Sequence, residues 1–554
     1  MTTEPNQNVA ARLSRTARLT PTGLAIVEAA GPPRSDGSRD YRGITFEELD
    51  GKSDQIARGL IRWGVQPGMR IVLAVPFGAE FIQLTFALLK ANCVPVLVDP
   101  GMGRQHLIRC LREARPDGFM AIPKAQAIRT LLRGKFPSAQ FNVTVGRRLF
   151  WGGRTLRQIE HLGKAELTLS PSRESDDAAV IFTTGSTGPP KGVRYTHQIF
   201  NNQIDLIRER YQIRPGSRDL ACFPLFGLFD CVMGVTTIIP DMDPTRPADV
   251  NPQRILEAVD QWEADQAFGS PALWNTVSRW CLQTGNRLSS LRRVLSAGAP
   301  VPPGVLAALR QIVHPEAEIF TPYGATEALP IASIESRTVL DETAAASLQG
   351  KGTCVGSRFK KIQWKVIAIH DGPAENIADT SEVARGEIGE LMVSGPVVTS
   401  QYVTRPEQNA LHKVSDGERV WHRMGDVGYL DAQDRFWFCG RKSHRVQTGL
   451  GTLYTVPCEA IFNAHPAVYR SALVGIGPAG DQQPVLIVEP QQDWDAKQVG
   501  AAEQLIAELT ELAETHPLTA GIKDVRIYPQ RLPVDIRHNS KIFREQLAGW
   551  AGGA

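Results

Sequence analysis

Apolar residues follow two alternating patterns over the first 330 residues of the chain. Short continuous apolar runs, which predict buried strands, alternate with longer stretches of helical periodicity. The clearest unit predicts a strand at residues 71–75, a helix at 78–91 and a strand at 94–98. Further strands are expected at residues 176–184, 292–298 and 316–324. This alternation is typical of an α/β architecture, in which loops at the strand ends bind ligands.

The pattern changes in the last third of the chain. Residues 386–440 form short apolar runs separated by turns, which predicts a small β subdomain. Beyond Arg441 the pattern is mixed, with strands expected at residues 468–476 and 483–490. A helix is expected at residues 501–516, where one face carries Leu505, Ile506, Leu509 and Leu512. We therefore predict a large α/β N-terminal domain over residues 1–440, with sheets flanked by helices, and a smaller α+β C-terminal domain over residues 441–554.

Length and composition agree with this division. The chain has 554 residues, whereas a single core rarely grows beyond about 250–300 residues. The net charge of +3 gives no argument for a nucleic-acid partner. Eight cysteines without C-x-x-C pairs or zinc spacing predict reduced, mostly buried thiols in a cytoplasmic protein. The most apolar stretch is interrupted by Pro76, Glu80 and Lys90, so no integral membrane span is expected.

One stretch has an unusual charge. Residues 118–159 contain no acidic residue but eight basic ones, namely Lys124, Arg129, Arg133, Lys135, Arg147, Arg148, Arg154 and Arg157. A solvated face is the interpretation we favour from the sequence. A docking surface for an acidic partner or an anionic membrane is the alternative.

The strongest motif covers residues 183–192 and follows a predicted strand. Its glycines allow the backbone to approach an anion closely, and its hydroxyl groups and lysine can contact phosphate oxygens. The spacing is not that of a Walker A loop, because Pro190 replaces the second glycine of that motif. We predict that the segment binds phosphates through Thr183, Thr184, Gly185, Ser186, Thr187, Gly188 and Lys191. A flexible linker is the alternative, but apolar runs flank the segment on both sides.

The segment TTGSTGPPKGV resembles the signature loop of the acyl-adenylate-forming superfamily, which includes acyl-CoA synthetases, adenylation domains and firefly-type luciferases. Five motifs in the order of that family, over about residues 180–544, carry the resemblance. The resemblance implies ATP as a co-substrate, Mg²⁺ as a cofactor, and transfer of AMP to a carboxylate with release of pyrophosphate. ATP would lie between the two domains.

The resemblance also implies a nucleoside site. Gly298, Ala299 and Pro300 match a segment that lies along the adenine, and the following helix start offers a purely structural explanation. Tyr323, followed by Gly324, offers a ring for stacking on the adenine. Asp426 matches the aspartate that accepts both ribose hydroxyls, and Arg441 matches an arginine that also contacts the ribose. A surface ion pair is the alternative for Arg441.

Three further residues are implied as catalytic. Thr326 offers a hydroxyl to the α-phosphate, and Glu327 would hold Mg²⁺, which prefers oxygen ligands. Lys541, in RHNSKIFR, matches the mobile C-terminal lysine that reaches the carboxylate and the α-phosphate. An ammonium group there would stabilise the negative charge of the transition state.

Two departures from the superfamily concern the acyl group and the second step. The histidine common after Pro-Leu-Phe is absent, and Phe223, Phe226 and Phe229 predict an apolar acyl pocket, with core packing as the alternative. At the hinge, Ser443 stands where Asp or Lys is usual, and about two residues are inserted before Pro457. This turn swings into the site for thioester formation in CoA ligases, so its alteration argues against CoA as a substrate.

The segments RHNSKIFR and VDPGMGRQHLIRCL are most similar to the β-lactone synthetases of bacterial long-chain olefin biosynthesis. The function implied is activation of a long-chain β-hydroxy acid as acyl-AMP, followed by closure to a β-lactone. His197 and His444 are candidate proton acceptors for that closure. Partners would be the other enzymes of the olefin pathway. The alternatives are a long-chain acyl-CoA ligase and, more remotely, a non-catalytic acyl or nucleotide sensor.

Overall fold

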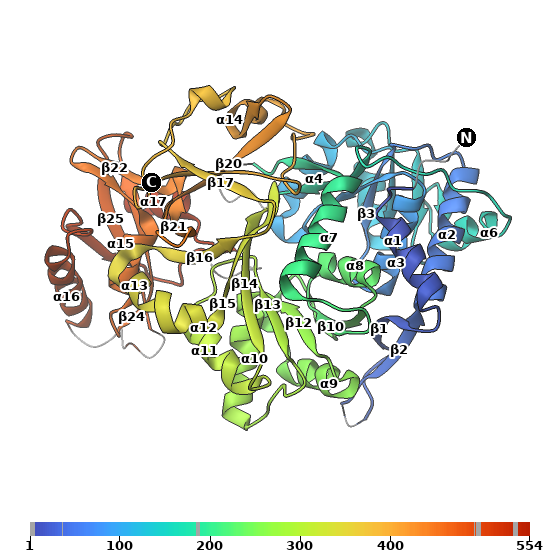
Figure 1. Cartoon of the computed structure of the whole chain (residues 1–554), viewed down its shortest axis with the longest axis horizontal. Helices are drawn as coiled ribbons and strands as arrows, with labels where there is room; N and C mark the ends of the chain where they lie inside the picture. Colours follow the sequence, from blue (N-terminus) through green and yellow to red (C-terminus); the bar gives the residue numbers. More distant parts are fainter. Residues whose placement is uncertain are drawn as a thin grey trace.

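The computed structural model describes residues 6–35, 37–183, 189–491, 494, 500–535 and 541–553. Two large sheets and their helices form most of the molecule, and the C-terminal elements, drawn in red, lie at one end (Figure 1). The large α/β portion and the smaller C-terminal portion agree with the predicted fold class.

The larger sheet has fourteen strands, of which thirteen follow one path. The path order is β17 (Gln363–Ile367), β18 (Gly389–Ser394), β20 (Arg419–Leu430), β21 (Arg435–Arg441), β16 (Thr353–Arg358), β15 (Ala328–Glu335), β14 (Glu318–Ala325), β13 (Arg293–Ser296), β12 (Gln266–Gly269), β10 (Arg218–Ala221), β11 (Thr236–Ile239), β1 (Leu24–Ala30) and β2 (Asp40–Thr45). Strand β19 (Lys413–Asp416) pairs with β20. The strands expected in residues 386–440 form, and β21 joins them to the large sheet through β16.

The second sheet has seven strands, and all neighbouring pairs except the last are parallel. Its order is β7 (Arg154–Thr155), β6 (Phe141–Thr144), β5 (Gly118–Ala121), β3 (Arg70–Ala74), β4 (Val94–Leu97), β8 (Asp177–Phe182) and β9 (Gly192–Thr196). Strand β8 leads directly into the predicted phosphate loop. Because β5, β6 and β8 run in the same direction, the segments that follow them leave the sheet at one edge.

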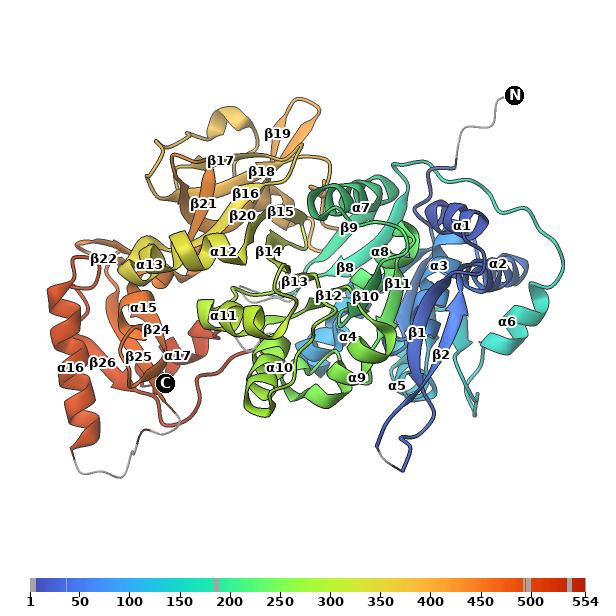
Figure 2. The same ribbon diagram turned by 60° about the horizontal axis from the view of Figure 1, so that its bottom comes forward.

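Helices cover and separate these sheets (Figures 1 and 2). They are α1 (Ala10–Leu19), α2 (Phe46–Arg62), α3 (Ala79–Lys90), α4 (Arg104–Glu113), α5 (Pro123–Leu131), α6 (Leu156–Leu162), α7 (His197–Tyr211), α8 (Pro224–Met233), α9 (Pro252–Trp262), α10 (Pro271–Thr284), α11 (Pro303–Ile312), α12 (Ser336–Thr338), α13 (Ala344–Ala346), α14 (Glu407–His412), α15 (Thr455–Asn463), α16 (Ala501–Thr515) and α17 (Arg544–Ala551). The predicted β-α-β unit near the N-terminus is confirmed as β3, α3 and β4.

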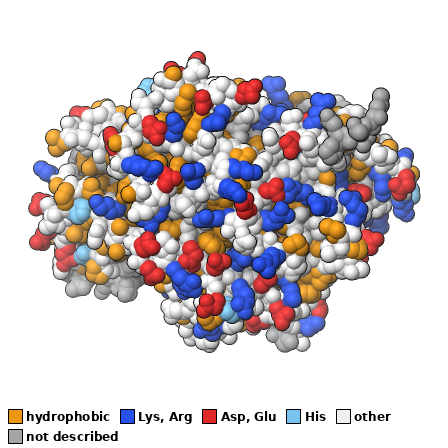
Figure 3. Space-filling view, viewed as in Figure 1, with side chains coloured by type: hydrophobic (Ala, Val, Ile, Leu, Met, Phe, Trp, Pro, Cys, Tyr) orange, Lys and Arg blue, Asp and Glu red, His pale blue; other side chains and the backbone are white. Residues whose placement is uncertain are grey.

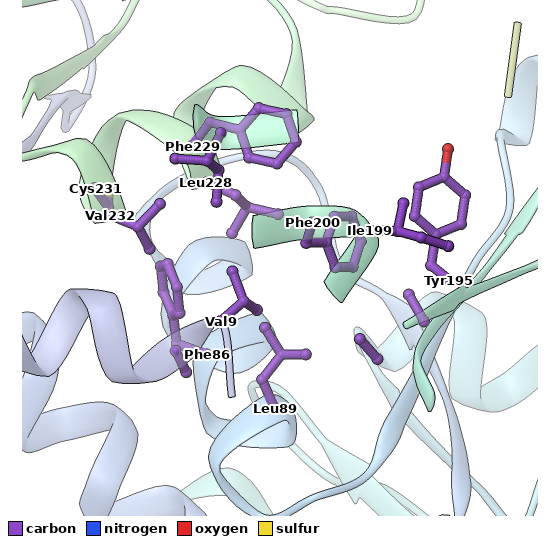
Figure 4. Packing of buried hydrophobic residues seen from close by; sticks show 14 of the residues in the cluster. Val9, Phe86, Leu89, Tyr195, Ile199, Phe200, Leu228, Phe229, Cys231 and Val232 are labelled. Carbon is purple, nitrogen blue, oxygen red and sulfur yellow. The ribbon is translucent and has the colours of Figure 1, made fainter. Parts of the chain in front are cut away.

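The main core joins the two sheets. It includes Ile26 of the larger sheet, Leu73 of the smaller one, and side chains of α3, α7 and α8. Figure 4 shows part of this packing, where Phe86, Phe200 and Phe229 approach one another from three helices. The helices between the sheets therefore fix the relative position of the strand ends at which ligands bind.

The C-terminal elements build a core of their own. Strands β24 (Val468–Ile476), β25 (Gln483–Pro490) and β26 (Asp524–Ile527) form a three-stranded sheet. One face packs Leu473 and Leu486 against α15 and α16, and the other packs Val474 towards α17. The two predicted strands and the predicted helix of this region are confirmed, with Leu505 and Leu509 buried. A separate hairpin joins β22 (Val446–Thr448) to β23 (Gly451–Leu453).

All eight cysteines are free thiols and buried, as predicted. Burial raises the pKa of the Cys93 thiol to about 12 and that of Cys354 to about 11. The thiols are therefore protonated at neutral pH.

Candidate active site

A tight hairpin between β14 and β15 presents two of the predicted catalytic residues. Thr326 and Glu327 form the turn itself. A side chain at Gly324 would meet the Ala328 carbonyl oxygen at 2.7 Å, so glycine permits the close approach of the two strands. The Tyr195 hydroxyl donates to the Thr326 carbonyl oxygen at 2.6 Å and ties the turn to β9.

The Glu327 carboxylate is buried and ionised. Its side chain is only 8% exposed, and the Tyr402 hydroxyl donates to its Oε1 at 2.8 Å. Burial alone would raise the pKa of Glu327, but the nearby Lys191 ammonium, the Tyr402 hydrogen bond and Lys413 outweigh it and lower the pKa. A carboxylate kept charged in a buried position fits a ligand for Mg²⁺, which commonly binds one or two carboxylates plus substrate phosphates.

Two lysines lie beside this carboxylate. The Lys191 Nζ lies 5.0 Å from the centroid of the Tyr402 ring, and the Lys413 Nζ lies 5.5 Å from the same centroid. Lys413 also donates to the Thr399 carbonyl oxygen at 2.5 Å and to its hydroxyl at 3.1 Å. Thr399 in turn donates its N–H and hydroxyl to the Glu327 carbonyl oxygen. The lysines, Tyr402 and the Glu327 hairpin therefore form one connected cluster.

Desolvation controls the charges of this cluster. Burial lowers the pKa of Lys413 to about 7 and also lowers that of Lys191. His412, whose Nε2 lies 3.2 Å from the Lys191 Nζ, has its pKa lowered to about 4 by burial. At neutral pH the histidine is therefore neutral and Lys413 is only partly protonated. An anion bound beside the two lysines would restore their usual affinity for protons.

The base of the predicted phosphate loop is described, and its centre is not. The Thr183 N–H donates to the Lys191 carbonyl oxygen at 3.0 Å, and the Lys191 N–H donates to the Thr183 hydroxyl at 3.0 Å. These two bonds hold the two described ends of the motif together, and the Lys191 ammonium lies near enough to Glu327 to lower the pKa of that carboxyl. The other predicted phosphate contacts, Thr184, Gly185, Ser186, Thr187 and Gly188, lie outside the described residues.

Two neighbouring strands bring the predicted nucleoside residues together. Asp426 on β20 and Arg441 on β21 are direct cross-strand partners, and the Arg441 guanidinium lies 2.9 Å from the Asp426 Oδ1. The Tyr323 hydroxyl donates to the Asp426 Oδ2 at 2.5 Å. Burial raises the pKa of Asp426, while Arg441 opposes the shift. The alternative prediction of a surface ion pair for Arg441 is wrong in one respect, because the partner, Asp426, is buried and only 4% exposed.

The predicted adenine segment lies at the end of β13. Gly298 has φ +99°, a conformation that favours glycine, and Gly298 and Ala299 form a bend one residue after the strand ends at Ser296. The backbone thus leaves the sheet at the same edge as the β14–β15 turn, since β13 and β14 are parallel.

The C-terminal candidates occupy a different part of the molecule. Lys541 precedes α17, and its N–H donates to the Asp535 Oδ1 at 2.9 Å. A bridge between Val534 and Ile542 closes the segment, whose residues 536–540 lie outside the described chain. The backbone of Lys541 is therefore held beside Asp535 in the C-terminal region.

A chain of ion pairs holds the start of the predicted hinge. Lys442 pairs with Glu390 at 3.0 Å, and Glu390 also pairs with Arg423, with both of the latter side chains almost completely buried. Ser443 lies in the short 3-10 turn Lys442–His444. The following β22–β23 hairpin exposes Leu450 at its tip, where the side chain is 98% exposed.

The three predicted acyl-pocket phenylalanines are distributed around α8. Phe229 lines a narrow apolar cavity of about 30 Å³ together with Leu225, Leu228 and Val232 of the same helix. Phe86 of α3 and Phe200 of α7 also line it, and Figure 4 shows Phe86 beside Val232 and Phe200 beside Leu228. Phe226 instead stacks on Phe268 at 3.6 Å between ring centroids, and Phe223 also packs against Phe268. Only Phe229 of the three therefore lines this cavity.

The two histidine candidates have structural partners. His197 is buried, its Nδ1 accepts a hydrogen bond from the Val9 N–H at 3.3 Å, and burial lowers its pKa to about 4. The Nε2 of His444 lies 3.7 Å from a carboxylate oxygen of Glu545 on α17. His197 belongs to the packing between α1 and α7 rather than to the cluster around Glu327.

The class of this protein follows from its match to a known family. Residues 13–403 match the AMP-binding enzyme family, and the chain belongs to that family. It is an AMP-forming enzyme. No helix in the part of the chain that the structure describes is long and apolar enough to cross a membrane.

Two relatives are similar over nearly the whole chain. The olefin beta-lactone synthetase of Xanthomonas campestris pv. campestris is 47% identical, covering 98% of this chain and 97% of that protein. The olefin beta-lactone synthetase of Stenotrophomonas maltophilia is 45% identical and covers 98% of each chain. Among solved structures, the amide bond synthetase McbA from Marinactinospora thermotolerans has a TM-score of 0.77 at 22% identity, covering 99% of each chain. That likeness supports the fold alone.

Proposed function

We propose that the chain activates a long-chain β-hydroxy carboxylic acid with ATP and closes the acyl-AMP to a β-lactone. The observation that carries the proposal is the 45–47% identity to two olefin beta-lactone synthetases over nearly the full chain. In the first step a carboxylate oxygen attacks the α-phosphorus, and the bond to pyrophosphate breaks. In the second step the β-hydroxyl oxygen attacks the acyl carbon, the bond to AMP breaks, and the hydroxyl proton leaves.

The polar cluster supports the first step. Asp426, oriented by Arg441 and Tyr323, is the proposed acceptor for the ribose hydroxyls, and the Thr326 hydroxyl is the proposed donor to the α-phosphate. Glu327 is the proposed ligand of Mg²⁺, which when bound neutralises charge on the phosphates. Lys541 is proposed to reach the carboxylate and the α-phosphate from the C-terminal region, with the domain boundary between residues 440 and 441.

Lys413 extends this assignment to a residue that the sequence patterns do not reveal. In its protonated form, which a bound anion favours, it gives the cluster a second cation beside Lys191, against the single carboxylate of Glu327. Such an excess of positive charge fits the leaving pyrophosphate. We therefore assign the stabilisation of pyrophosphate to both lysines, because preorganised charges at a leaving group lower the barrier.

The apolar lining below α8 fits a long acyl chain in its chemistry. It contains no charged side chain, and its free space of about 30 Å³ would widen by movement of the lining side chains to admit the chain. An alkyl chain there gains about 0.8 kcal/mol per buried methylene. In this proposal Phe229 contacts the chain, while Phe223 and Phe226 line its path beside Phe268.

The tethered hydroxyl supports a second step without CoA. Tethering can supply effective molarities of about 10⁵ M or more, provided that the enzyme holds the reacting atoms in line. The proton acceptor is not assigned to His197, whose Nδ1 already accepts a hydrogen bond. The phosphate of AMP can accept the proton as the bond to it breaks.

The enzyme would work in the cytoplasm beside the other enzymes of an olefin pathway.

One product analysis tests the proposal. A β-hydroxy fatty acid, ATP and Mg²⁺ are incubated with the enzyme, with and without CoA, and the products are identified by mass spectrometry. We expect AMP, pyrophosphate and a neutral product lighter than the acid by one water, with no need for CoA. CoA-dependent thioester formation from unsubstituted fatty acids, without any lactone, would instead establish an acyl-CoA ligase.

A further inference from the structure

The acid-free stretch of residues 118–159 combines unpaired cations with exposed apolar side chains. Ten large apolar side chains are exposed in the described part of the chain, and four of them lie here. They are Ile128 (41% exposed), Leu131 (82%), Leu149 (54%) and Phe150 (79%). Exposed apolar side chains that cluster in this way mark an interaction site more often than scattered ones do.

Helix α5 presents one part of this surface. Lys124, Ile128 and Leu131 are spaced at i, i+4 and i+7, so they share the outer face of the helix, and all three are exposed. Gln126 lies on the opposite face, where it is buried and donates to the Val143 carbonyl oxygen at 2.9 Å. The helix therefore packs through its inner face and leaves a mixed basic and apolar face uncovered.

The loop between β6 and β7 presents the other part, and hydrogen bonds within the loop and to β6 hold its conformation. Trp151 is only 4% exposed, and its Nε1 donates to the Thr144 hydroxyl at 2.9 Å. The Arg148 guanidinium donates to the Gly153 carbonyl oxygen across the loop. A Cβ atom added at Gly146 would lie 3.6 Å from the Pro123 ring, so the loop lies beside the start of α5. The loop is thus anchored from inside while Leu149 and Phe150 face solvent.

The cations of this surface have no acidic partner among the described residues. None of the eight basic residues forms an ion pair with any residue that the structure describes. The acids that flank the stretch have other partners, since Glu160 pairs with Lys52 and Asp117 accepts the Arg70 N–H. On the face shown in Figure 3, by contrast, basic and acidic side chains are interspersed.

The surface shares one edge of its sheet with the predicted phosphate-binding segment. Helix α5 and the β6–β7 loop follow β5 and β6, and the phosphate loop follows β8. These strands are parallel members of one sheet, so all three segments leave it at the same edge. Figure 2 places α5 and α6 well away from the C-terminal helices α16 and α17.

We propose that the outer face of α5 and the β6–β7 loop bind the surface of an anionic lipid bilayer. Interleaved basic and aliphatic or aromatic side chains are the features by which peripheral segments hold such surfaces, because cations attract the headgroups while apolar side chains enter the boundary. The acidic surface of a folded protein would match the cations but would offer no apolar surface for Leu131 and Phe150 to contact. The inference is linked to the proposed function in one respect, since a long-chain acid resides in the bilayer.

Vesicle co-sedimentation tests this inference with the full-length enzyme. The vesicles contain phosphatidylcholine alone or with about one third of the anionic phosphatidylglycerol. One variant combines Arg133→Gln, Lys135→Gln and Arg147→Gln, and a second combines Leu149→Gln and Phe150→Gln. Matched controls are Arg15→Gln, Arg279→Gln and Lys523→Gln, which remove the same charge elsewhere, and Leu19→Gln, which removes another exposed leucine.

The wild type and both controls are expected to bind the anionic vesicles but not the neutral ones, and salt should weaken binding. The charge variant should bind at least tenfold more weakly, and the apolar variant several-fold more weakly. Acyl-AMP formation from a short, water-soluble acid should be unchanged in all of them, which separates this test from the test of function. Equal vesicle binding by variants and wild type, or no binding by the wild type at low salt, would overturn the inference. Binding of the wild type to an acidic protein but not to anionic vesicles would overturn it as well.

Discussion

The polar cluster at Glu327 and the apolar cavity below α8 are built in opposite ways. In the cluster, Tyr402, Thr399 and Lys413 come from a segment about 70–90 residues beyond the Glu327 turn, and each makes a specific directional contact. In the cavity, a ring of aliphatic and aromatic side chains makes non-directional contacts that neighbouring residues share. The difference teaches that one substitution should remove a defined charge from the cluster, whereas one substitution in the cavity should change only its shape.

The largest effect is expected for Lys541→Ala, which removes a charge proposed to act in the transition state. Substrate-dependent exchange of pyrophosphate into ATP should slow by on the order of 10²–10³, while ATP binding remains. Lys523→Ala, an exposed lysine of the same region, is the control. Exchange at the wild-type rate would remove Lys541 from the mechanism.

Glu327→Gln should follow, because it keeps the shape of the side chain and its contact with Tyr402 but removes the charge. We expect a loss of about 10² in activity and a higher Mg²⁺ requirement, with thermal unfolding nearly unchanged. The measurement is activity against Mg²⁺ concentration, with Glu318→Gln on β14 as the control. A variant that unfolds while each folded molecule keeps full activity would show that Glu327 is structural.

Lys413→Met tests the cation that only the structure revealed. Loss of a charge-assisted hydrogen bond costs about 2 kcal/mol, which corresponds to roughly a 30-fold higher KM for pyrophosphate in the exchange reaction. The affinity for AMP should not change.

The pH dependence sharpens this test. Burial lowers the pKa of Lys413 to about 7, so the free enzyme loses this cation as pH rises through 7. Pyrophosphate affinity should therefore fall between about pH 6 and pH 8.5, beyond the change due to pyrophosphate itself. Lys413→Arg should remove that additional dependence, since arginine stays charged. An unaltered KM for pyrophosphate in both variants would limit Lys413 to supporting Thr399.

Phe229→Trp should have the smallest effect, on specificity rather than rate. The larger ring shortens the cavity, and exclusion of one methylene costs about 0.8 kcal/mol, or roughly a fourfold loss in kcat/KM for the longest chains. Short chains should be unaffected. Leu206→Phe, an enlargement of a buried residue of α7 outside the cavity, is the control. A uniform loss over all chain lengths would place the acyl chain elsewhere.

Local patterns predicted the elements well where an apolar run was clear. The apolar runs at residues 468–476 and 483–490 predicted β24 and β25 with the observed bounds, because both faces of these strands are buried by helices. The same kind of reasoning could have identified the cavity wall. Leu225, Leu228, Phe229 and Val232 recur at i, i+3, i+4 and i+7, whereas Phe226 falls on another face of the helix.

The site was predictable only in part. Motifs pointed to Asp426 and Arg441, but their cross-strand pairing depends on the register of β20 and β21, which no local pattern encodes. Lys413 and Tyr402 reach Glu327 from a distant segment, and a lysine at a strand start ordinarily signals a solvated edge. Their role follows from tertiary contacts alone.

The burial of all eight cysteines makes the chain suitable for site-specific labelling. A thiol reacts as its thiolate, and at neutral pH the native thiols are protonated and enclosed. A cysteine introduced in place of Leu450, at the exposed tip of the β22–β23 hairpin, should therefore be alkylated far faster than any of them. A fluorophore attached there would report the surroundings of the hairpin while ATP, acid and CoA are added in turn, without removal of a single native cysteine.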